Sequence, residues 1–144
     1  MKIMVLNGPN INFLGIREKT IYGVEDYEYL CNLIKTEAEE SNISATILQS
    51  NIEGEIINFI QQAYHEKYDG IIINPGAYTH YSYAIYDAIK SVSIPTVEVH
   101  ISNIHSRDEF RRKSVTAGAC VGIIGGFGLY GYIMALNYFK QKQK

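Results

Sequence analysis

Two residues near the start of the sequence could carry proton chemistry, because Arg17 stands five positions before Tyr22 in a stretch without apolar periodicity. An ordinary tyrosine has a pKa of about 10, and lowering it to about 7 takes ~4 kcal/mol. One guanidinium at ~4 Å supplies about that much when the effective dielectric constant is near 20. Tyr22 beside Arg17 would therefore be a general base able to remove a proton next to a carbonyl, without a metal ion or a Schiff base. The alternative, in which Tyr22 packs and Arg17 is solvated, stays open in a chain of twelve tyrosines.

His100 is the best candidate for a general acid, since it directly follows the predicted strand residues Val97, Glu98 and Val99. Glu98 comes two residues earlier and points to the same side of a strand, so it could orient the imidazole and favour its protonated form. A surface histidine at the end of a strand is the alternative interpretation.

Three basic side chains could bind an anion near these groups. His80 is expected to open a helix, where backbone N–H groups favour anions. Arg107 and Arg111 stand four positions apart, and a short helix within 103–114 would place both on one face. That face would suit a hydroxylated or carboxylate ligand, and a solvated face is the alternative.

The elements that must position these residues follow from apolar periodicity. Strands are predicted at 1–6, 44–49, 71–73, 96–100 and 121–124. Helices are predicted at 26–40 and 53–66, over Ala84–Ile89, within 103–114 and over Leu129–Leu136. Strands alternating with helices indicate a parallel sheet covered on both faces. At this length we expect a three-layer flavodoxin-like α/β fold with a five-stranded sheet in the order 2-1-3-4-5, forming one domain over residues 1–144.

This architecture also predicts where a ligand binds. In open α/β sheets the site lies beyond the carboxyl ends of the strands, where the strand order diverges. Here that place lies between strands 1 and 3, at the polar tips Asn7–Asn10, Asn74–Thr79 and His100–Ser102. About fifteen residues separate the first tip from the next helix, well beyond the ~2–6 residues usual for such loops. A loop of that length is usually functional, and it carries Arg17 and Tyr22.

Composition narrows the function classes. A net charge of −2 and a pI near 6.1 give no electrostatic case for nucleic acid or an anionic membrane. The apolar stretches fall well short of the ~20 residues that span a bilayer, and the N-terminus does not read as a signal peptide. Cys31 and Cys120 are isolated, which fits a reducing cytoplasm.

Other chemistries lack their residues. The G-x-G-x-x-G match at 126–131 is not in a first βα unit and has no acidic residue about 20 positions later, so we interpret its glycines as structural. Asn7 and Asn74 stand where a phospho-acceptor receiver domain needs aspartates to hold Mg²⁺. Two histidines near 100–105 are too few for zinc, and no lysine follows a strand tip to form a Schiff base. We therefore expect neither a metal nor a cofactor.

Several long motifs carry a family resemblance. They are LNGPNINFLGIREKTIYG, QSNIEGEIINFI, IIINPGAYTHYSYAIYDAI, VEVHISNIHSRDEFRRKS and GFGLYGYIMAL, in this order over nearly the whole chain. In these motifs the sequence resembles the type II 3-dehydroquinases. The resemblance implies the same fold without metal or cofactor, and elimination of water from 3-dehydroquinate to give 3-dehydroshikimate in the shikimate pathway.

The resemblance also implies roles for individual residues. Tyr22 would be the base that takes the C2 proton, with Arg17 lowering its pKa. His100 would protonate the departing hydroxyl while Glu98 orients it, and Asn10 would help to hold the water that stabilises an enolate. Substrate hydroxyls and carboxylate would be held by Asn74, His80, Arg111 and the backbone N–H groups of Ile101 and Ser102.

Assembly enters through the same resemblance. The family forms trimers packed into dodecamers, so a homododecamer is expected, with Asp87 reaching a neighbouring subunit's site. Tyr81 departs from the usual H-T-S-x-A pattern, which leaves substrate affinity and oligomer packing open. Two other classes remain as alternatives: a flavodoxin-like nucleotide-binding module, and a structural or regulatory protein on the same fold.

Overall fold

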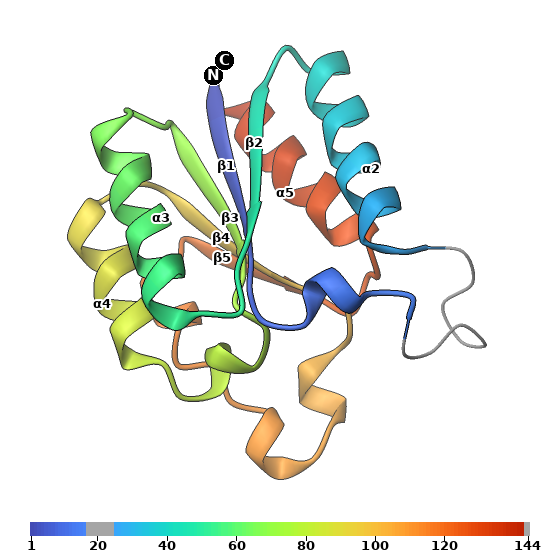
Figure 1. Cartoon of the computed structure of the whole chain (residues 1–144), viewed down its shortest axis with the longest axis vertical. Coiled ribbons are helices and arrows are strands. Elements are labelled where there is room, and N and C mark those ends of the chain that lie inside the picture. The colour runs from blue at the N-terminus through green and yellow to red at the C-terminus, as the bar shows by residue number, and fades with distance from the viewer. Residues whose placement is uncertain (17–24, 143–144) are drawn as a thin grey trace.

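Alternating strands and helices build a three-layer arrangement in the computed structural model, which describes residues 1–16 and 25–142 (Figure 1). Within these residues five strands form one parallel sheet in the order β2-β1-β3-β4-β5. The strands are β1 (Lys2–Asn7), β2 (Ser44–Gln49), β3 (Gly70–Asn74), β4 (Thr96–His100) and β5 (Gly122–Gly125). The predicted flavodoxin-like α/β fold and its strand order are confirmed.

Four α-helices of the described chain cover the two faces of this sheet (Figure 1). They are α2 (Tyr27–Glu40), α3 (Glu53–His65), α4 (Tyr83–Val92) and α5 (Tyr130–Gln141). Helices α2 and α5 pack on one face and α3 and α4 on the other. Alternation along β1 divides its side chains between the two faces, since Ile3 and Val5 join the α2–α5 core while Met4 and Leu6 join the α3–α4 core.

Side-chain caps set where two of these helices begin. Asp26 Oδ1 accepts a hydrogen bond of 2.8 Å from Tyr29 N at the start of α2. Ser82 Oγ accepts one of 3.0 Å from Ile85 N at the start of α4. Each cap satisfies a backbone N–H that has no partner within the helix.

The glycine-rich segment 126–131 runs into the first turn of α5, and its last glycine, Gly131, has a packing role. A Cβ at Gly131 would lie 3.2 Å from Val99 Cγ1 and 3.5 Å from Ile124 Cγ2. A side chain at this position would push against Val99, so the glycine lets α5 lie close to β4 and β5. This contact supports the interpretation of the G-x-G-x-x-G match as a packing feature.

Two local predictions are wrong. The helix expected within 103–114 is instead two separate 3-10 turns, η3 (Ile104–Ser106) and η4 (Glu109–Arg111), with Arg107 extended between them. This polar segment has too little apolar surface to stabilise a helix by packing, and the Asn103 side chain caps the first turn by accepting from His105 N at 3.1 Å. His80 does not open α4 either, because it ends the 3-10 turn η2 (Gly76–His80) before the Ser82 cap.

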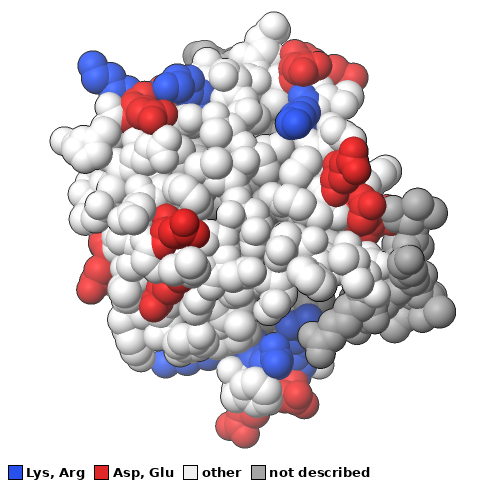
Figure 2. All heavy atoms as spheres, in the orientation of Figure 1, with Lys and Arg blue, Asp and Glu red and all other residues white. Residues whose placement is uncertain are grey.

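None of the described helices is long and apolar enough to cross a membrane. On the face shown in Figure 2, Lys and Arg side chains lie at the upper left, at the upper right and at the lower end, where acidic side chains lie beside them.

Candidate active site

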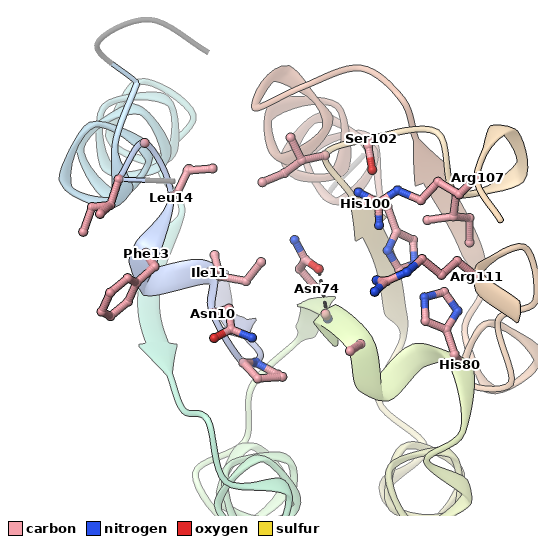
Figure 3. Close-up of a pocket in the computed structure, with 17 residues that line it drawn as sticks. Asn10, Ile11, Phe13, Leu14, Asn74, His80, His100, Ser102, Arg107 and Arg111 are labelled. Carbon is pink, nitrogen blue, oxygen red and sulfur yellow. Dashed lines mark hydrogen bonds between the residues drawn. The ribbon is translucent and has the colours of Figure 1, made fainter. Parts of the chain in front are cut away.

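A pocket of about 470 Å³ opens at the carboxyl ends of β1, β3 and β4, where the strand order predicts a ligand site. One wall is mostly apolar and comes from η1 (Ile11–Phe13) and the residues after it, with Leu14 and Ile16 in the lining. The opposite wall carries His80, His100 and two arginines, and Asn74 lies between the two walls (Figure 3). The volume is in the range of small-molecule sites.

The ionisable side chains in the described lining of this pocket are all basic. Its described lining contains Arg107, Arg111, His80 and His100 and no acidic side chain. Arg107 and Arg111 reach the pocket from the two turns η3 and η4, so they converge although the helix predicted to align them is absent. A lining with two permanent cations suits a small anionic ligand such as a carboxylate.

His100 is fixed by a buried carboxylate behind it. His100 Nε2 lies 2.6 Å from Glu98 Oε1, and the side chain of Glu98 is completely buried. Both residues belong to β4 and project to the same side because they are two positions apart. An ionised carboxylate only accepts hydrogen bonds, so Nε2 donates and Nδ1 is the ring nitrogen left for other contacts.

Three hydroxyl groups complete the surroundings of this carboxylate. Glu98 Oε1 accepts from Thr79 Oγ1 at 2.8 Å and from Ser114 Oγ at 2.7 Å. Glu98 Oε2 accepts from Thr116 Oγ1 at 2.5 Å. We call Glu98, His100 and these three hydroxyl residues the Glu98 cage. The hydroxyl oxygens also lie within hydrogen-bond distance of each other, but each has a single proton, and the carboxylate can take all three.

The other members of the cage determine the charge state of Glu98. Burial acts to raise the pKa of this carboxyl, but the hydrogen bonds from His100, Thr116 and Ser114 and the charge of His100 outweigh burial, so the pKa is lowered. Glu98 is therefore ionised at neutral pH, and it can hold the His100 ring in one orientation.

His80 and Asn74 are each anchored by backbone groups. His80 Nδ1 lies 2.7 Å from the carbonyl oxygen of Lys113, which can only accept, so Nδ1 carries the proton and Nε2 is left for a ligand. Asn74 Oδ1 accepts from Gly76 N at 3.1 Å, and its Nδ2 donates to the hydroxyl of Tyr132 at 2.9 Å. Both side chains line the pocket: His80 keeps Nε2 available to a ligand, and Asn74 keeps one acceptor and one donor position.

The predicted anion-binding N–H groups of Ile101 and Ser102 directly follow β4 in the pocket lining. Neither of them donates a hydrogen bond within the described part of the chain, so both are available to a carboxylate. Asn10 lies across the pocket in a left-handed conformation (φ 67°), with its backbone N donating to Asn51 Oδ1 at 3.0 Å.

The structure gathers most of the predicted site residues in this one pocket. Those in the lining are Asn10, Asn74, His80, His100, Ile101, Ser102 and Arg111. Glu98 lies behind His100, and Asp87 is exposed on α4 outside the pocket, so its expected role at a neighbouring subunit stays a prediction. Arg17 and Tyr22 lie outside the described residues, and the pairing predicted for them also stays a prediction.

Sequence reasoning missed the polar residues that support the site from behind. The hydroxyls of Thr79, Ser114 and Thr116 come from segments far from Glu98 in the sequence, and threonine and serine are too common for their type to indicate this role. Tyr132 gave a weak signal, because a tyrosine on the buried face of a helix needs a partner for its hydroxyl. In the residues that the structure describes there is no group of three or more His, Cys, Asp or Glu side chains that could hold a metal ion.

This site has a buried carboxylate–histidine pair that faces a basic pocket at the end of a parallel sheet. Such an arrangement is typical of α/β enzymes that work by acid–base chemistry. Comparison with known proteins makes this more specific. Residues 1–140 match the family model described as Dehydroquinase class II. The chain is 69% identical over 144 residues to the 3-dehydroquinate dehydratase of Clostridium perfringens, covering 100% of both chains.

Solved structures agree with the family match. The crystal structure of the type II dehydroquinase from Butyrivibrio crossotus superposes with a TM-score of 0.93 at 61% identity, covering 96% of each chain. That of the type II dehydroquinase from Propionibacterium acnes gives a TM-score of 0.92 at 38% identity, covering 97% of this chain and 96% of the other. The chain therefore belongs to the class II dehydroquinase family, a family of hydro-lyases.

Proposed function

We propose that this protein is a 3-dehydroquinate dehydratase of the shikimate pathway, which eliminates water from 3-dehydroquinate to give 3-dehydroshikimate through an enolate. The family match and the 69% identity to a 3-dehydroquinate dehydratase support the reaction. The observation that carries the acid–base chemistry is the Glu98–His100 pair, held at 2.6 Å against a pocket without acidic side chains in its described lining.

The elimination is proposed to begin with a proton transfer to Tyr22. Its phenolate, favoured by Arg17, takes the C2 proton of the substrate, and the electron pair moves to the carbonyl oxygen to form an enolate. A water held by Asn10 stabilises that oxygen by hydrogen bonding where the charge develops. Asn10 supports this step by its place in the pocket wall across from His100 (Figure 3).

The second step is loss of the hydroxyl. The enolate re-forms the carbonyl, the C–O bond of the departing hydroxyl breaks, and protonated His100 supplies the proton that turns the leaving group into water. Glu98 holds the Nε2 proton, so the proton that is transferred leaves from Nδ1. His100 donates its Nε2 proton to Glu98 both before and after the transfer. The imidazole ring therefore need not turn when its charge changes.

The substrate is proposed to bind through its carboxylate and hydroxyls. The free N–H groups of Ile101 and Ser102 take the carboxylate, while Asn74, His80 and Arg111 contact the hydroxyls. We further propose that residues 1–144 act as one catalytic domain without metal or cofactor, and that cytoplasmic homododecamers of four trimers bring Asp87 to a neighbouring site.

The test is the ultraviolet absorbance of the conjugated enone product after mixing purified protein with 3-dehydroquinate. We expect a rise with the wild type that survives chelator and borohydride, because no metal or imine takes part. Tyr22→Phe should lose ~10²–10⁴ in turnover, the usual contribution of one positioned base. Tyr29→Phe, at an exposed tyrosine of α2, is the matched control and should leave turnover unchanged.

Turnover near the wild-type value in Tyr22→Phe would contradict the assignment of the base. No rise with folded wild-type protein would contradict the reaction itself and favour a nucleotide-binding module on the same fold.

A further inference from the structure

We propose that Tyr132 is a positioning residue for the substrate site: its buried hydroxyl fixes the orientation of the Asn74 carboxamide and so decides which of its groups meets the ligand. The proposal rests on the proposed function in taking Asn74 to contact the substrate. Tyr132 lies on α5 (Tyr130–Gln141), is completely buried and does not line the pocket.

One hydroxyl joins two asparagines at the ends of neighbouring strands. Asn7 and Asn74 are register partners in the parallel pairing of β1 with β3, and both end their strands. The Tyr132 hydroxyl donates to Asn7 Oδ1 at 2.7 Å and accepts from Asn74 Nδ2 at 2.9 Å. We call Asn7, Tyr132 and Asn74 the asparagine–tyrosine chain.

A backbone group determines the direction of every hydrogen bond in this chain. Gly76 N–H can only donate, and it lies 3.1 Å from Asn74 Oδ1. Asn74 Nδ2 must then face Tyr132, whose oxygen accepts from it. The only proton of the Tyr132 hydroxyl is left for Asn7, which accepts it through Oδ1.

The consequence for the site is a carboxamide held at both ends. Gly76 occupies one lone pair of Asn74 Oδ1 and Tyr132 accepts one N–H, which leaves one acceptor and one donor position of a side chain that faces the pocket (Figure 3). Without the Tyr132 hydroxyl, the buried N–H of Asn74 would lose its partner, and the side chain would gain alternative rotamers. A ligand hydroxyl would then meet a less ordered Asn74.

The decisive experiment is a double-mutant cycle of Tyr132→Phe with Asn74→Ala, followed by steady-state kinetics with 3-dehydroquinate. We expect Tyr132→Phe to raise KM about tenfold, the scale of one neutral hydrogen bond, with a smaller change in kcat. In the Asn74→Ala background the same substitution should change KM less than twofold, because Tyr132 acts through Asn74.

Tyr68→Phe is the matched control. Tyr68 is also buried, and its hydroxyl donates to Thr46 Oγ1 at 2.8 Å outside the pocket lining, so its loss should leave KM unchanged. An equal factor for Tyr132→Phe in both backgrounds, or an unchanged KM, would overturn the proposal. A purely structural role of Tyr132 predicts the equal factor.

A second measurement is independent of turnover, and its wild-type part does not require Tyr132→Phe to fold. The side-chain NH₂ resonances of Asn74, assigned by their loss in Asn74→Ala, should show slow hydrogen exchange and distinct proton shifts in the wild-type protein. Tyr132→Phe should accelerate that exchange at least tenfold, and Tyr68→Phe should not change it. Random-coil shifts and fast exchange in the wild type would overturn the proposal. An inactive wild type with the expected resonances would contradict the proposed function alone.

Discussion

Two buried polar clusters support the pocket from behind, and they solve different physical problems. The Glu98 cage places a carboxylate charge in the interior and surrounds it with hydrogen bonds from His100 and three hydroxyls. The asparagine–tyrosine chain is neutral, and Asn7 Nδ2 in it has no hydrogen-bond partner within the described part of the chain. A buried charge is destabilising unless it is saturated with partners, whereas a neutral amide tolerates a missing one at a cost of about 1–3 kcal/mol.

The comparison also separates what each cluster does for the site. In the cage every donor points at one carboxylate, so the cluster fixes a charge and, through it, the orientation of the His100 ring. In the asparagine–tyrosine chain the hydrogen bonds run in one direction, from Gly76 N–H through Asn74 and Tyr132 to Asn7, so the cluster fixes the orientation of an amide. Substitutions in the cage should therefore affect proton transfer, and those in the chain should affect ligand contact.

The largest effect should come from removing the charge of the cage. Glu98→Gln keeps the shape of the side chain but removes its charge and places an NH₂ group among side chains that all donate to the carboxylate. We expect turnover to fall by at least ~10², because His100 loses the charged acceptor that orients its ring and favours its protonated form. Steady-state kinetics measures this, with Glu39→Gln at an exposed position of α2 as the control. Wild-type turnover in Glu98→Gln would show that the ring is oriented by other contacts.

The lowered pKa of Glu98 predicts how the stability depends on pH. A carboxyl whose pKa is lower in the folded state stabilises that state above its ordinary pKa, which is 4.5 here, and this contribution is lost as the pH falls through the folded-state value. Urea unfolding of wild type and Glu98→Gln should therefore give free energies that differ most above pH 4.5 and converge below it. A difference that is constant over this range would contradict the ionised state of Glu98.

How much of each cluster could be predicted from the sequence depends on how far apart its members are in the chain. Glu98 and His100 are two positions apart on one strand, so strand geometry alone places them together. Tyr132 is separated from Asn74 by 58 positions and from Asn7 by 125, and only the packing of α5 on the sheet brings them into contact.

The fold shows the same contrast. Apolar periodicity predicts the five strands and their helices because burial imposes it on every residue of an element. The segment 103–114 has a short-range charge pattern without an apolar face, and there side-chain capping by Asn103 decides the turns. Arg107 and Arg111 converge on the pocket because of those turns. Their spacing therefore predicts correctly that they act together, but not through the shared helix face from which we inferred it.

A smaller effect should distinguish the two oxygens of Glu98 within the cage. Oε2 accepts from Thr116, whereas Oε1 accepts from Thr79, Ser114 and His100. Thr116→Val should lower the free energy of unfolding by about 1–3 kcal/mol because it leaves a buried carboxylate oxygen without that donor. Thr79→Val, the matched substitution, should cost only about 0.5–1.5 kcal/mol because Oε1 keeps two donors. Equal losses in urea unfolding would contradict this asymmetry.

The smallest effect should come from the neutral chain, at Asn7. Asn7→Leu keeps a similar volume and has two opposing consequences: the Tyr132 hydroxyl loses its acceptor, and the unpartnered Nδ2 is removed from the interior. We expect these to offset each other within about 1 kcal/mol in urea unfolding. KM should rise less than in Tyr132→Phe, because the Tyr132 oxygen still accepts from Asn74.

If Asn7→Leu lowers the free energy of unfolding by more than ~3 kcal/mol, Nδ2 has a partner in the folded protein, because removing an unpaired donor breaks no hydrogen bond. Tyr27 is a candidate for that partner: burial and the neighbouring Cys31 raise the pKa of its phenol to about 12, while the Asn7 amide acts in the opposite direction. Tyr27→Phe separates the two cases. It should leave the free energy of unfolding of Asn7→Leu unchanged, and in the wild-type background it should be destabilising only if its hydroxyl accepts from Asn7.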